Sequence, residues 1–247
     1  MDKKVFRLFF QLIAFLAVGV SLTACNEDKT SPEDNPLGYG EIHRELAVGE
    51  TFTLSMGNYT SEDDYVGTLA DTQDGKQVFT AVHVGESKLV TPNHQDSYLM
   101  IVSANVDPFD GLTTPWGESF DNMLETLGLK EDSEGVNADA QTIETIAGGM
   151  RTTYHFSNNK LEQVAVDFTL SKLSQGSMTG EEILLIYLEE SFNFTNTQGI
   201  YGKYFNQYTF EKATTWIEIS EIPEGTEGKE GYDHVANFYD AKKFPIE

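Results

Sequence analysis

The sequence predicts a β-sandwich over residues 41–107, followed by an α+β domain over residues 108–247. Two observations lead to this prediction. In the first range, apolar and polar residues alternate in short runs separated by turn-forming residues about every ten positions, which is typical of antiparallel strands. In the second range, two stretches with helical spacing each precede a set of alternating runs, which indicates helices packed on an antiparallel sheet.

The composition favours a folded chain and limits the classes of partner that we expect. Hydrophobic residues make up 39% of the chain and aromatic residues 12%, which is enough to build a core. The 40 acidic residues outnumber the 16 basic residues, and the formal net charge is −24. Such a surface repels phosphate backbones and anionic lipids, so we expect no nucleic acid partner and no electrostatic membrane patch. The excess acid serves solubility or, alternatively, binds Ca²⁺ weakly at several places.

Residues 1–24 have the layout of a secretory signal peptide, with basic residues at the start and an apolar run from Leu8 to Leu22. The tetrapeptide Leu22-Thr23-Ala24-Cys25 resembles the lipobox that lipoprotein signal peptidase reads. The resemblance implies cleavage before Cys25 and acyl chains, such as palmitate, on that residue, which would hold the protein on a membrane. An uncleaved membrane anchor is the alternative. Because Cys25 is the only cysteine, its lipidation leaves no thiol for disulfides, catalysis or metal binding.

Residues 25–40 are expected to be a lipidated, flexible tether, because proline, glycine and charged residues dominate them. Asn26 resembles the signal for outer-membrane routing in Gram-negative sorting. The acidic pair Glu27-Asp28 resembles the export tag of surface lipoproteins in glycan-degrading gut anaerobes. These resemblances imply a lipoprotein of the cell outer membrane that faces outward, and they leave a periplasmic orientation open.

The strands of the β-sandwich are expected within Leu46–Leu54, Val78–Val84, Leu89–Val90 and Tyr98–Val102, with a hairpin turn at Asp71–Gly75. The segments Leu46–Leu54 and Phe79–Ser87 resemble the opening strand and the Thr-Ala-Val turn of group 2 bacterial immunoglobulin-like domains. The resemblance implies an all-β immunoglobulin-like sandwich that acts as a spacer or adhesive module. The tryptophan-containing strand usual in that family is absent.

Two histidines of this first part are candidate metal ligands. His83 and His94 could flank a metal ion together with Asp63 or Asp64. One histidine on a strand face and one in a loop is the simpler interpretation, so we expect no metal and no cofactor.

Two helices are expected in the α+β domain. The second begins with Thr179 and Glu182, spaced as a capping box, and is apolar nearly all round, so it should be deeply buried. The first begins after Ser119, ends before Gly128, and places four apolar residues on one face, namely Phe120, Met123, Leu124 and Leu127.

Three strands are expected after each helix, and Asn158-Asn159 suits a tight hairpin between two of them. Helix-strand-strand-strand therefore occurs twice, which indicates a tandem α-β-β-β repeat with both helices packed on one antiparallel sheet. The expected strands are Thr142–Ala147, Thr152–Phe156 and Leu161–Leu170, then Tyr204–Phe210, Thr215–Ser220 and Val235–Tyr239.

Three motifs of this domain resemble the β-lactamase-inhibitor-protein-like and outer-membrane-assembly-lipoprotein architectures. They are Trp116-Gly117-Glu118-Ser119, the hairpin pattern from Tyr154 to Leu161, and Thr215-Trp216-Ile217-x-Ile219. The resemblance implies protein binding across an exposed sheet face, without a cofactor.

Aromatic residues crowd positions 192–216, and four of them are candidate binding residues: Tyr201, Tyr204, Tyr208 and Trp216. They suit either the stacking of sugar rings or a protein interface. Ordinary packing within strands is the alternative, since aromatic residues favour strands.

The sequence holds no signature of a nucleotide-binding loop, a serine hydrolase or a zinc protease, so we expect no enzyme. Paired carboxylates for glycoside hydrolysis are the only catalytic alternative, from Glu181-Glu182, Glu189-Glu190 or Glu218 with Glu221. The expected function is a non-enzymatic, lipid-anchored envelope protein whose C-terminal domain binds a protein or a glycan. A role as accessory subunit of an outer-membrane assembly is the second hypothesis, and glycoside hydrolysis the third.

Overall fold

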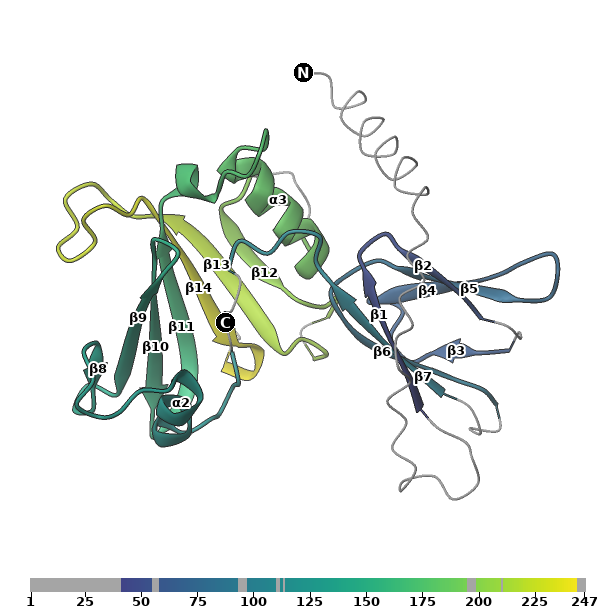
Figure 1. Ribbon diagram of the computed structural model, residues 1–247, viewed down its shortest axis with the longest axis horizontal. Helices are drawn as coiled ribbons and strands as arrows, with labels where there is room; N and C mark the ends of the chain where they lie inside the picture. The colour runs from purple at the N-terminus through teal and green to yellow at the C-terminus, as the bar shows by residue number, and fades with distance from the viewer. Residues whose placement is uncertain are drawn as a thin grey trace.

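The computed structural model describes residues 41–54, 58–92, 97–109, 112, 114–194, 199–209 and 211–243. The expected signal peptide over residues 1–24, Cys25, the expected tether and His94 lie outside the described residues. Within them the protein is mostly β-sheet, with three sheets and two α-helices, which confirms a β-rich fold. Figure 1 shows two folded parts side by side: β1–β7 form one, and both helices with β8–β14 form the other. We call them the sandwich and the head.

The sandwich consists of two facing sheets with strand orders β1-β7-β6-β3 and β2-β5-β4. Strand alternation places Leu54, Phe79, Leu89 and Met100 between the sheets, each 0% exposed. The strands are β1 Glu41–Ala47, β2 Thr51–Leu54, β3 Thr60–Ser61, β4 Gly67–Asp71, β5 Gln77–Ala81, β6 Gly85–Val90 and β7 Ser97–Ser103.

Two features of the sandwich differ from the sequence prediction. The expected antiparallel arrangement is wrong for β1, which pairs parallel with β7, the last strand of the sandwich. A pair so distant in sequence needs no hairpin, and the chain between its strands is long enough to return to the same end. The strand expected to continue to Val84 ends at Ala81, because the N–H groups of Val82 and His83 both donate to the carbonyl of Val66. The predicted hairpin turn does join β4 to β5.

The head is built on one seven-stranded sheet with the order β12-β13-β14-β11-β10-β9-β8, antiparallel at every pairing. Its strands are β8 Val136–Asn137, β9 Thr142–Ala147, β10 Met150–Ser157, β11 Lys160–Phe168, β12 Gly202–Phe205, β13 Thr215–Glu221 and β14 His234–Asp240. Its helices are α2 Phe120–Leu127 and α3 Gly180–Ser191, with short 3₁₀ turns at Leu170–Leu173 and Ala241–Lys243.

The strand expected at Tyr204–Phe210 lies earlier, at Gly202–Phe205. It stops there because the Asn206 side-chain carbonyl accepts hydrogen bonds from the N–H groups of Thr214 and Thr215, which closes the loop to β13. The Asn158-Asn159 turn is confirmed: both residues have positive φ, +51° and +58°, as a two-residue hairpin requires.

Both helix caps follow the sequence signals. The Ser119 hydroxyl accepts from the Asn122 N–H at 3.2 Å, and Gly128 adopts a left-handed φ of +67° at the end of α2. In α3, Thr179 and Glu182 bond reciprocally as a capping box. Gly180 is required at the start of α3, because a Cβ there would lie 1.7 Å from the carbonyl oxygen of Leu170.

The core of the head lies on one face of the sheet, which we call the inner face. Residues from both helices pack there against the middle strands, and each fully buried large apolar side chain contributes about 1.5–3 kcal/mol. The central members, all buried, are Met123, Leu184, Leu188, Val164, Phe168, Ile217 and Phe238. None of the helices among the described residues is both long and apolar enough to cross a membrane.

A polar and aromatic joint connects the sandwich and the head. The Glu190 carboxylate at the end of α3 accepts hydrogen bonds from the backbone N–H and the side-chain amide of Asn105, both at 2.7 Å. The Gln207 amide donates to Asp63 at 2.7 Å. These contacts come from α3 and from the loop after β12, so they link two separate segments of the head to the sandwich and fix its orientation.

Candidate functional site

The outer face of the head sheet lies opposite the helices. Because neighbouring residues on a strand point to opposite faces, and residues paired across strands share a face, the register defines this surface as three rows of side chains. The middle row crosses six strands and consists of Glu144, Thr153, Ala165, Asn237, Glu218 and Lys203.

The middle row combines the amide of Asn237 and the hydroxyl of Thr153 with three charged side chains. Thr153, Asn237 and Glu218 are half-buried, as expected for a sheet surface without a covering helix. In the next row, Gln163 donates to the Asn237 side-chain oxygen at 3.0 Å, so the two amides hold each other in place. A row of fixed donors and acceptors suits recognition by hydrogen bonding.

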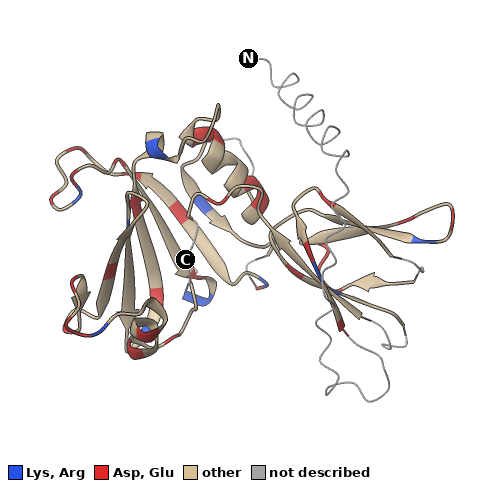
Figure 2. Ribbon diagram, in the orientation of Figure 1, with Lys and Arg blue, Asp and Glu red and all other residues tan. Residues whose placement is uncertain are grey.

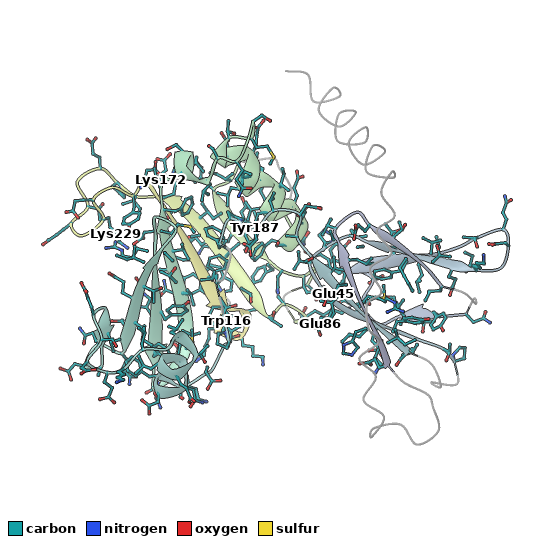
Figure 3. All side chains as sticks on the ribbon, in the orientation of Figure 1. Glu45, Glu86, Trp116, Lys172, Tyr187 and Lys229 are labelled. Carbon is teal, nitrogen blue, oxygen red and sulfur yellow. The ribbon has the colours of Figure 1, made fainter. Side chains whose placement is uncertain are left out.

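A buried ion cluster closes one end of the outer face, in the row that also holds Ile146, Val235 and Ser220. The Asp167 carboxylate is 1% exposed and accepts from Arg151 at 2.7 Å and from Lys229 at 2.6 Å. Lys229 belongs to the loop between β13 and β14, which therefore folds onto this end of the sheet (Figure 3). Together with Glu144, whose carboxylate lies 3.8 Å from Arg151, the two cations and two carboxylates balance the charge at this end of the sheet.

The third row, on the other side of the middle row from the ion cluster, holds His155. Burial disfavours its charged form and the nearby Lys229 ammonium repels it, so the pKa of His155 lies below its ordinary value. The imidazole is therefore neutral at pH 7 and adds a hydrogen-bonding group to the outer face without adding charge.

Aromatic side chains close the other end of the outer face. Trp216 stacks on Tyr239 with ring centroids 4.1 Å apart, and the Lys203 ammonium lies 5.4 Å from the Trp216 ring. The neighbouring Ala213 and Ala241 pack against these rings, so Trp216 is only 5% exposed. The outer face therefore has an arginine-containing ion cluster at one end, a polar middle row, and a pair of stacked aromatic rings at the other end.

The four aromatic residues singled out from the sequence do not form one platform. Tyr204 donates to the Tyr201 carbonyl at 2.9 Å, so these two lie together. Tyr208 is 58% exposed in the joint, where its ring meets Tyr65 edge-on at 4.5 Å, and Trp216 lies in the outer face. The structure thus brings two of the four together and assigns the others to different surfaces.

Tyr201 takes part in a hydrogen-bonded relay at the end of the sheet near the start of α3. Its hydroxyl donates to the Glu221 carboxylate at 2.8 Å and lies 2.9 Å from His234 Nε2, while His234 Nδ1 lies 2.6 Å from Asp233. Burial, followed by the bond to Glu221, raises the pKa of Tyr201 to about 12. Its phenol is therefore neutral across the physiological range.

The candidate metal and catalytic residues have other partners. His83 lies in the turn after β5, not on a strand as expected, and stacks on Tyr65 at 4.1 Å. Asp63 accepts from Gln207 across the joint. In the part of the chain that the structure describes, no three His, Cys, Asp or Glu residues are grouped as metal ligands.

The carboxylate pairs considered for glycoside hydrolysis are also separated or occupied. Glu182 belongs to the α3 capping box and Glu190 bonds Asn105 in the joint. Glu218 lies on the outer face, and Glu221, three residues along the same strand, points to the opposite face. Figure 2 shows acidic residues at positions spread over the ribbon of both parts of the molecule, not gathered at one place.

A cavity of about 460 Å³ lies in the joint, between the end of the sandwich, the chain segment that leaves it and the inner face of the head. Its described lining residues include aromatic rings and the carboxylate of Asp107. Sequence reasoning missed it, because its walls come from segments more than 100 positions apart and its residues are ordinary core types. The only sequence signal was the expected domain boundary between residues 107 and 108.

Comparisons with known proteins add no relative: no protein-family model matches the chain, and no curated protein matches it. The case for function therefore depends on the geometry of the outer face and the joint.

Proposed function

We propose that this protein is a non-enzymatic, lipid-anchored envelope protein whose head binds a protein partner across the outer face of its seven-stranded sheet. One observation carries this proposal: three registered rows of side chains form a sheet face on which neither helix packs. That face combines fixed amides with Tyr239 and Arg151, and tyrosine and arginine are enriched in protein interfaces. Trp216 is 5% exposed and supports the Tyr239 ring from below.

The order of elements in the head supports a repeat architecture that is expected to bind proteins across its sheet. The head reads α2 followed by β9, β10 and β11, then α3 followed by β12, β13 and β14, and the third strands of the two halves pair at the centre of the sheet. This order fits the tandem α-β-β-β repeat inferred from the sequence, with β8 as an addition. We propose likewise that the sandwich is an immunoglobulin-like spacer, which holds the head away from the membrane on a lipid at Cys25.

The outer face is tested by site-specific photo-crosslinking of the full-length protein in its own cells. A photoreactive amino acid replaces Thr153 or Asn237 in the middle row, and Asp121 or Glu125 on the exposed side of α2 serves as control. We expect one protein adduct from both outer-face positions and none from α2. Equal adducts from all four positions, or none from the sheet, would contradict the proposal.

Binding of the purified partner then gives the size of the effect. Asn237→Arg places a long cation in the middle row and should weaken binding at least about tenfold, which corresponds to about 1.4 kcal/mol. Glu125→Arg, with a larger change of charge at an exposed helix position, should change it less than about twofold. An integral membrane protein recovered in a one-to-one complex would identify the head as an assembly subunit. Binding to a glycan and to no protein would show that the ligand of the outer face is a glycan.

Membrane attachment is tested separately. Metabolic labelling with palmitate should label the wild-type protein but not Cys25→Ser, and protease treatment of intact cells reports whether the head faces outward. Unlabelled wild-type protein would exclude the lipid anchor without affecting the proposal for the outer face.

A further inference from the structure

The joint cavity adjoins a second, smaller cavity on the inner face of the head. The smaller cavity has a volume of about 190 Å³ and lies against β9, β10 and the end of α2. Phe109 and Leu112 line both cavities, so the two spaces meet at these side chains. The combined space is therefore elongated, with about 460 Å³ at the joint and a smaller extension beyond Phe109 and Leu112.

The smaller cavity has an apolar wall. Leu127, Met150 and Val166 contribute hydrocarbon surface, and the described lining residues carry no charge. Thr145 and Thr152 also line it, and each has a methyl group beside its hydroxyl. Met150 is half-buried and unbranched, so its side chain can adapt to a guest. Such a wall attracts apolar groups by removing them from water and offers little to a charged ligand.

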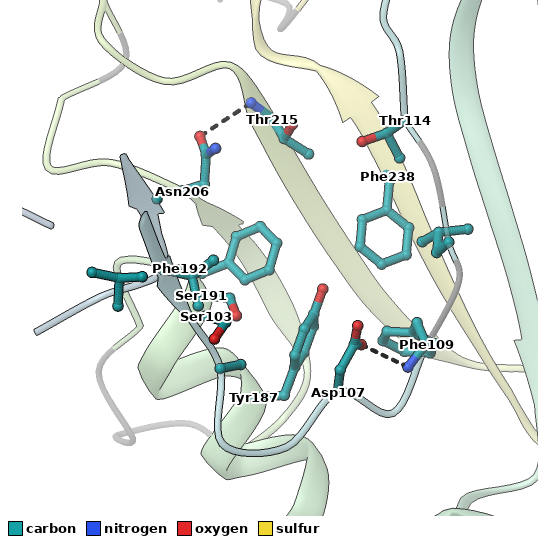
Figure 4. A pocket seen from close by; sticks show the side chains of 15 residues that line it. Ser103, Asp107, Phe109, Thr114, Tyr187, Ser191, Phe192, Asn206, Thr215 and Phe238 are labelled. Carbon is teal, nitrogen blue, oxygen red and sulfur yellow. Dashed lines mark hydrogen bonds between the residues drawn. The ribbon is translucent and has the colours of Figure 1, made fainter. Parts of the chain in front are cut away.

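Aromatic rings make up much of the described wall of the joint cavity. Phe109 contacts Phe238 and Tyr187 edge-to-face, at centroid distances of 5.5 and 5.4 Å, and Tyr187 contacts Phe192 at 5.8 Å. In Figure 4 the Tyr187 side chain projects into the cavity between Phe192 and Phe238. Because each ring packs against the next, the rings form a firm apolar surface for a guest.

Several polar groups of the joint cavity are committed to the protein itself. The Asn206 side-chain oxygen accepts from the Thr215 N–H at 3.1 Å, and the Thr215 hydroxyl accepts from the Trp116 indole at 2.8 Å (Figure 4 shows the first bond). The Asp107 carboxylate accepts from the Phe109 N–H at 2.9 Å. A sugar or a peptide needs many uncommitted donors and acceptors, whereas a hydrocarbon chain needs none.

From these observations we infer that the two cavities together bind a linear alkyl chain, such as that of a single-chain lipid. The chain starts among the aromatic rings of the joint cavity and passes Phe109 and Leu112 into the smaller cavity. A volume of about 460 Å³ lies within the range of small-molecule sites, and an extension of about 190 Å³ suits the end of a chain. The site is separate from the outer face, so it adds a second ligand to the proposed function and does not depend on it.

The test uses the full folded chain carrying Cys25→Ser, so that no detergent competes for the site. Isothermal titration calorimetry compares hexanol, octanol and decanol. We expect hexanol to bind with a Kd of about 1 mM, and each added methylene group to lower the Kd about fourfold, which corresponds to about 0.8 kcal/mol. A Kd that does not fall from hexanol to decanol would overturn the inference, as would the absence of binding by all three alcohols.

Three substitutions of alanine by phenylalanine locate the chain. Ala147 lines the smaller cavity, so Ala147→Phe should weaken decanol binding at least about tenfold and leave hexanol within about twofold. Ala104 lines the joint cavity, so Ala104→Phe should weaken all three alcohols at least about fivefold. Ala138 is exposed in the turn before β9, and Ala138→Phe is the matched control that should change no Kd beyond about twofold.

Circular dichroism verifies that each variant folds. Ala147 is exposed, so its replacement leaves the core intact, and Ser103→Leu at an exposed position of the joint cavity replaces Ala104→Phe if that variant does not fold. Equal losses for hexanol and decanol in Ala147→Phe would overturn the inference, because the smaller cavity would then not hold the end of the chain. A similar loss in Ala138→Phe would show general adsorption to the protein surface and overturn it as well.

Discussion

The outer face and the joint cavity belong largely to the same head, yet they offer opposite chemistry. On the outer face the charged groups are paired with one another, as in the cluster of Asp167, Arg151 and Lys229, and amides bond to amides. In the described wall of the cavity, the Asp107 carboxylate lies beside aromatic rings. The first surface suits a broad partner, and the second suits a small one.

The difference arises from strand alternation and from where the chain crosses the sheet. Side chains on the inner face are apolar because helices cover them, and the cavity lies where that covering passes from α3 to the segment leaving the sandwich. Side chains on the outer face have no helix to pack against, so they satisfy each other. One sheet thereby carries two kinds of surface. Alternate positions along each strand point to opposite faces, so the position of a residue in its strand determines the surface to which it belongs.

The largest expected effect tests this difference between the two faces with two adjacent residues of β11. Val164 is 0% exposed on the inner face, and Gln163 is half-buried on the outer face. Val164→Asp buries an unpaired charge and should cost more than about 4 kcal/mol of unfolding free energy. Gln163→Asp should cost about 1 kcal/mol or less. Urea unfolding measures both, and similar losses would mean that the outer face is packed like a core.

The second effect concerns Asp167, the buried charged residue of the outer face. Asp167→Asn removes the buried counter-charge that Arg151 and Lys229 share and leaves Arg151 with the more exposed Glu144, and we expect a loss of about 2–3 kcal/mol. The loss stays below that of a fully buried pair because the Lys229 side chain is 32% exposed and can turn to water.

Glu144 is the matched control for Asp167, since its carboxylate lies 3.8 Å from the same Arg151 but is 40% exposed. Glu144→Gln should cost about 0.5 kcal/mol or less. If thermal unfolding gave equal losses for the two variants, the burial of Asp167 would contribute nothing.

Much of the head was predictable from sequence, for local reasons. The caps of Ser119 and Thr179, the Asn158-Asn159 turn and strand β9 each depend on signals within a few residues. What failed depends on distant partners: β1 pairs parallel with a strand more than 50 positions away, and β12 ends early because Asn206 bonds to Thr214.

The candidate site was less predictable than the fold. Aromatic content identified Trp216 and Tyr201, but which surface each serves follows from strand register, as with Trp216 paired to Tyr239. Asp107 and Tyr187 meet only because α3 folds back to the joint, and no local pattern encodes that approach.

The third effect tests whether the joint fixes the cavity. Glu190 is 8% exposed and accepts two hydrogen bonds from Asn105, so Glu190→Ala leaves a backbone donor unpaired and should cost about 1–3 kcal/mol. The exposed neighbour Glu189 is the control, and Glu189→Ala should cost less than about 0.5 kcal/mol. Small-angle scattering should show a broader range of shapes for Glu190→Ala only. Unchanged scattering and stability would mean that other contacts hold the joint.

The smallest effect concerns Tyr201, whose hydrogen bonds to Glu221 and His234 lie at the end of the sheet, away from the middle row of the outer face. Its pKa of about 12 in the folded protein exceeds the ordinary value near 10, so the folded state resists its ionisation. The resulting stability is fully present below about pH 10 and is lost as the pH rises toward 12. Tyr201 is 39% exposed, so solvent screening reduces the effect to about 0.5 kcal/mol or less.

Wild-type protein should therefore lose stability more steeply between about pH 10 and pH 12 than Tyr201→Phe, measured by urea unfolding at each pH. Glu221→Gln removes the negative charge that faces the phenol, and its slope should lie between those of the other two proteins. Parallel slopes in all three would show that the relay has no influence on stability. A reduced slope that leaves binding at the outer face unchanged would establish that this relay acts independently of the partner surface.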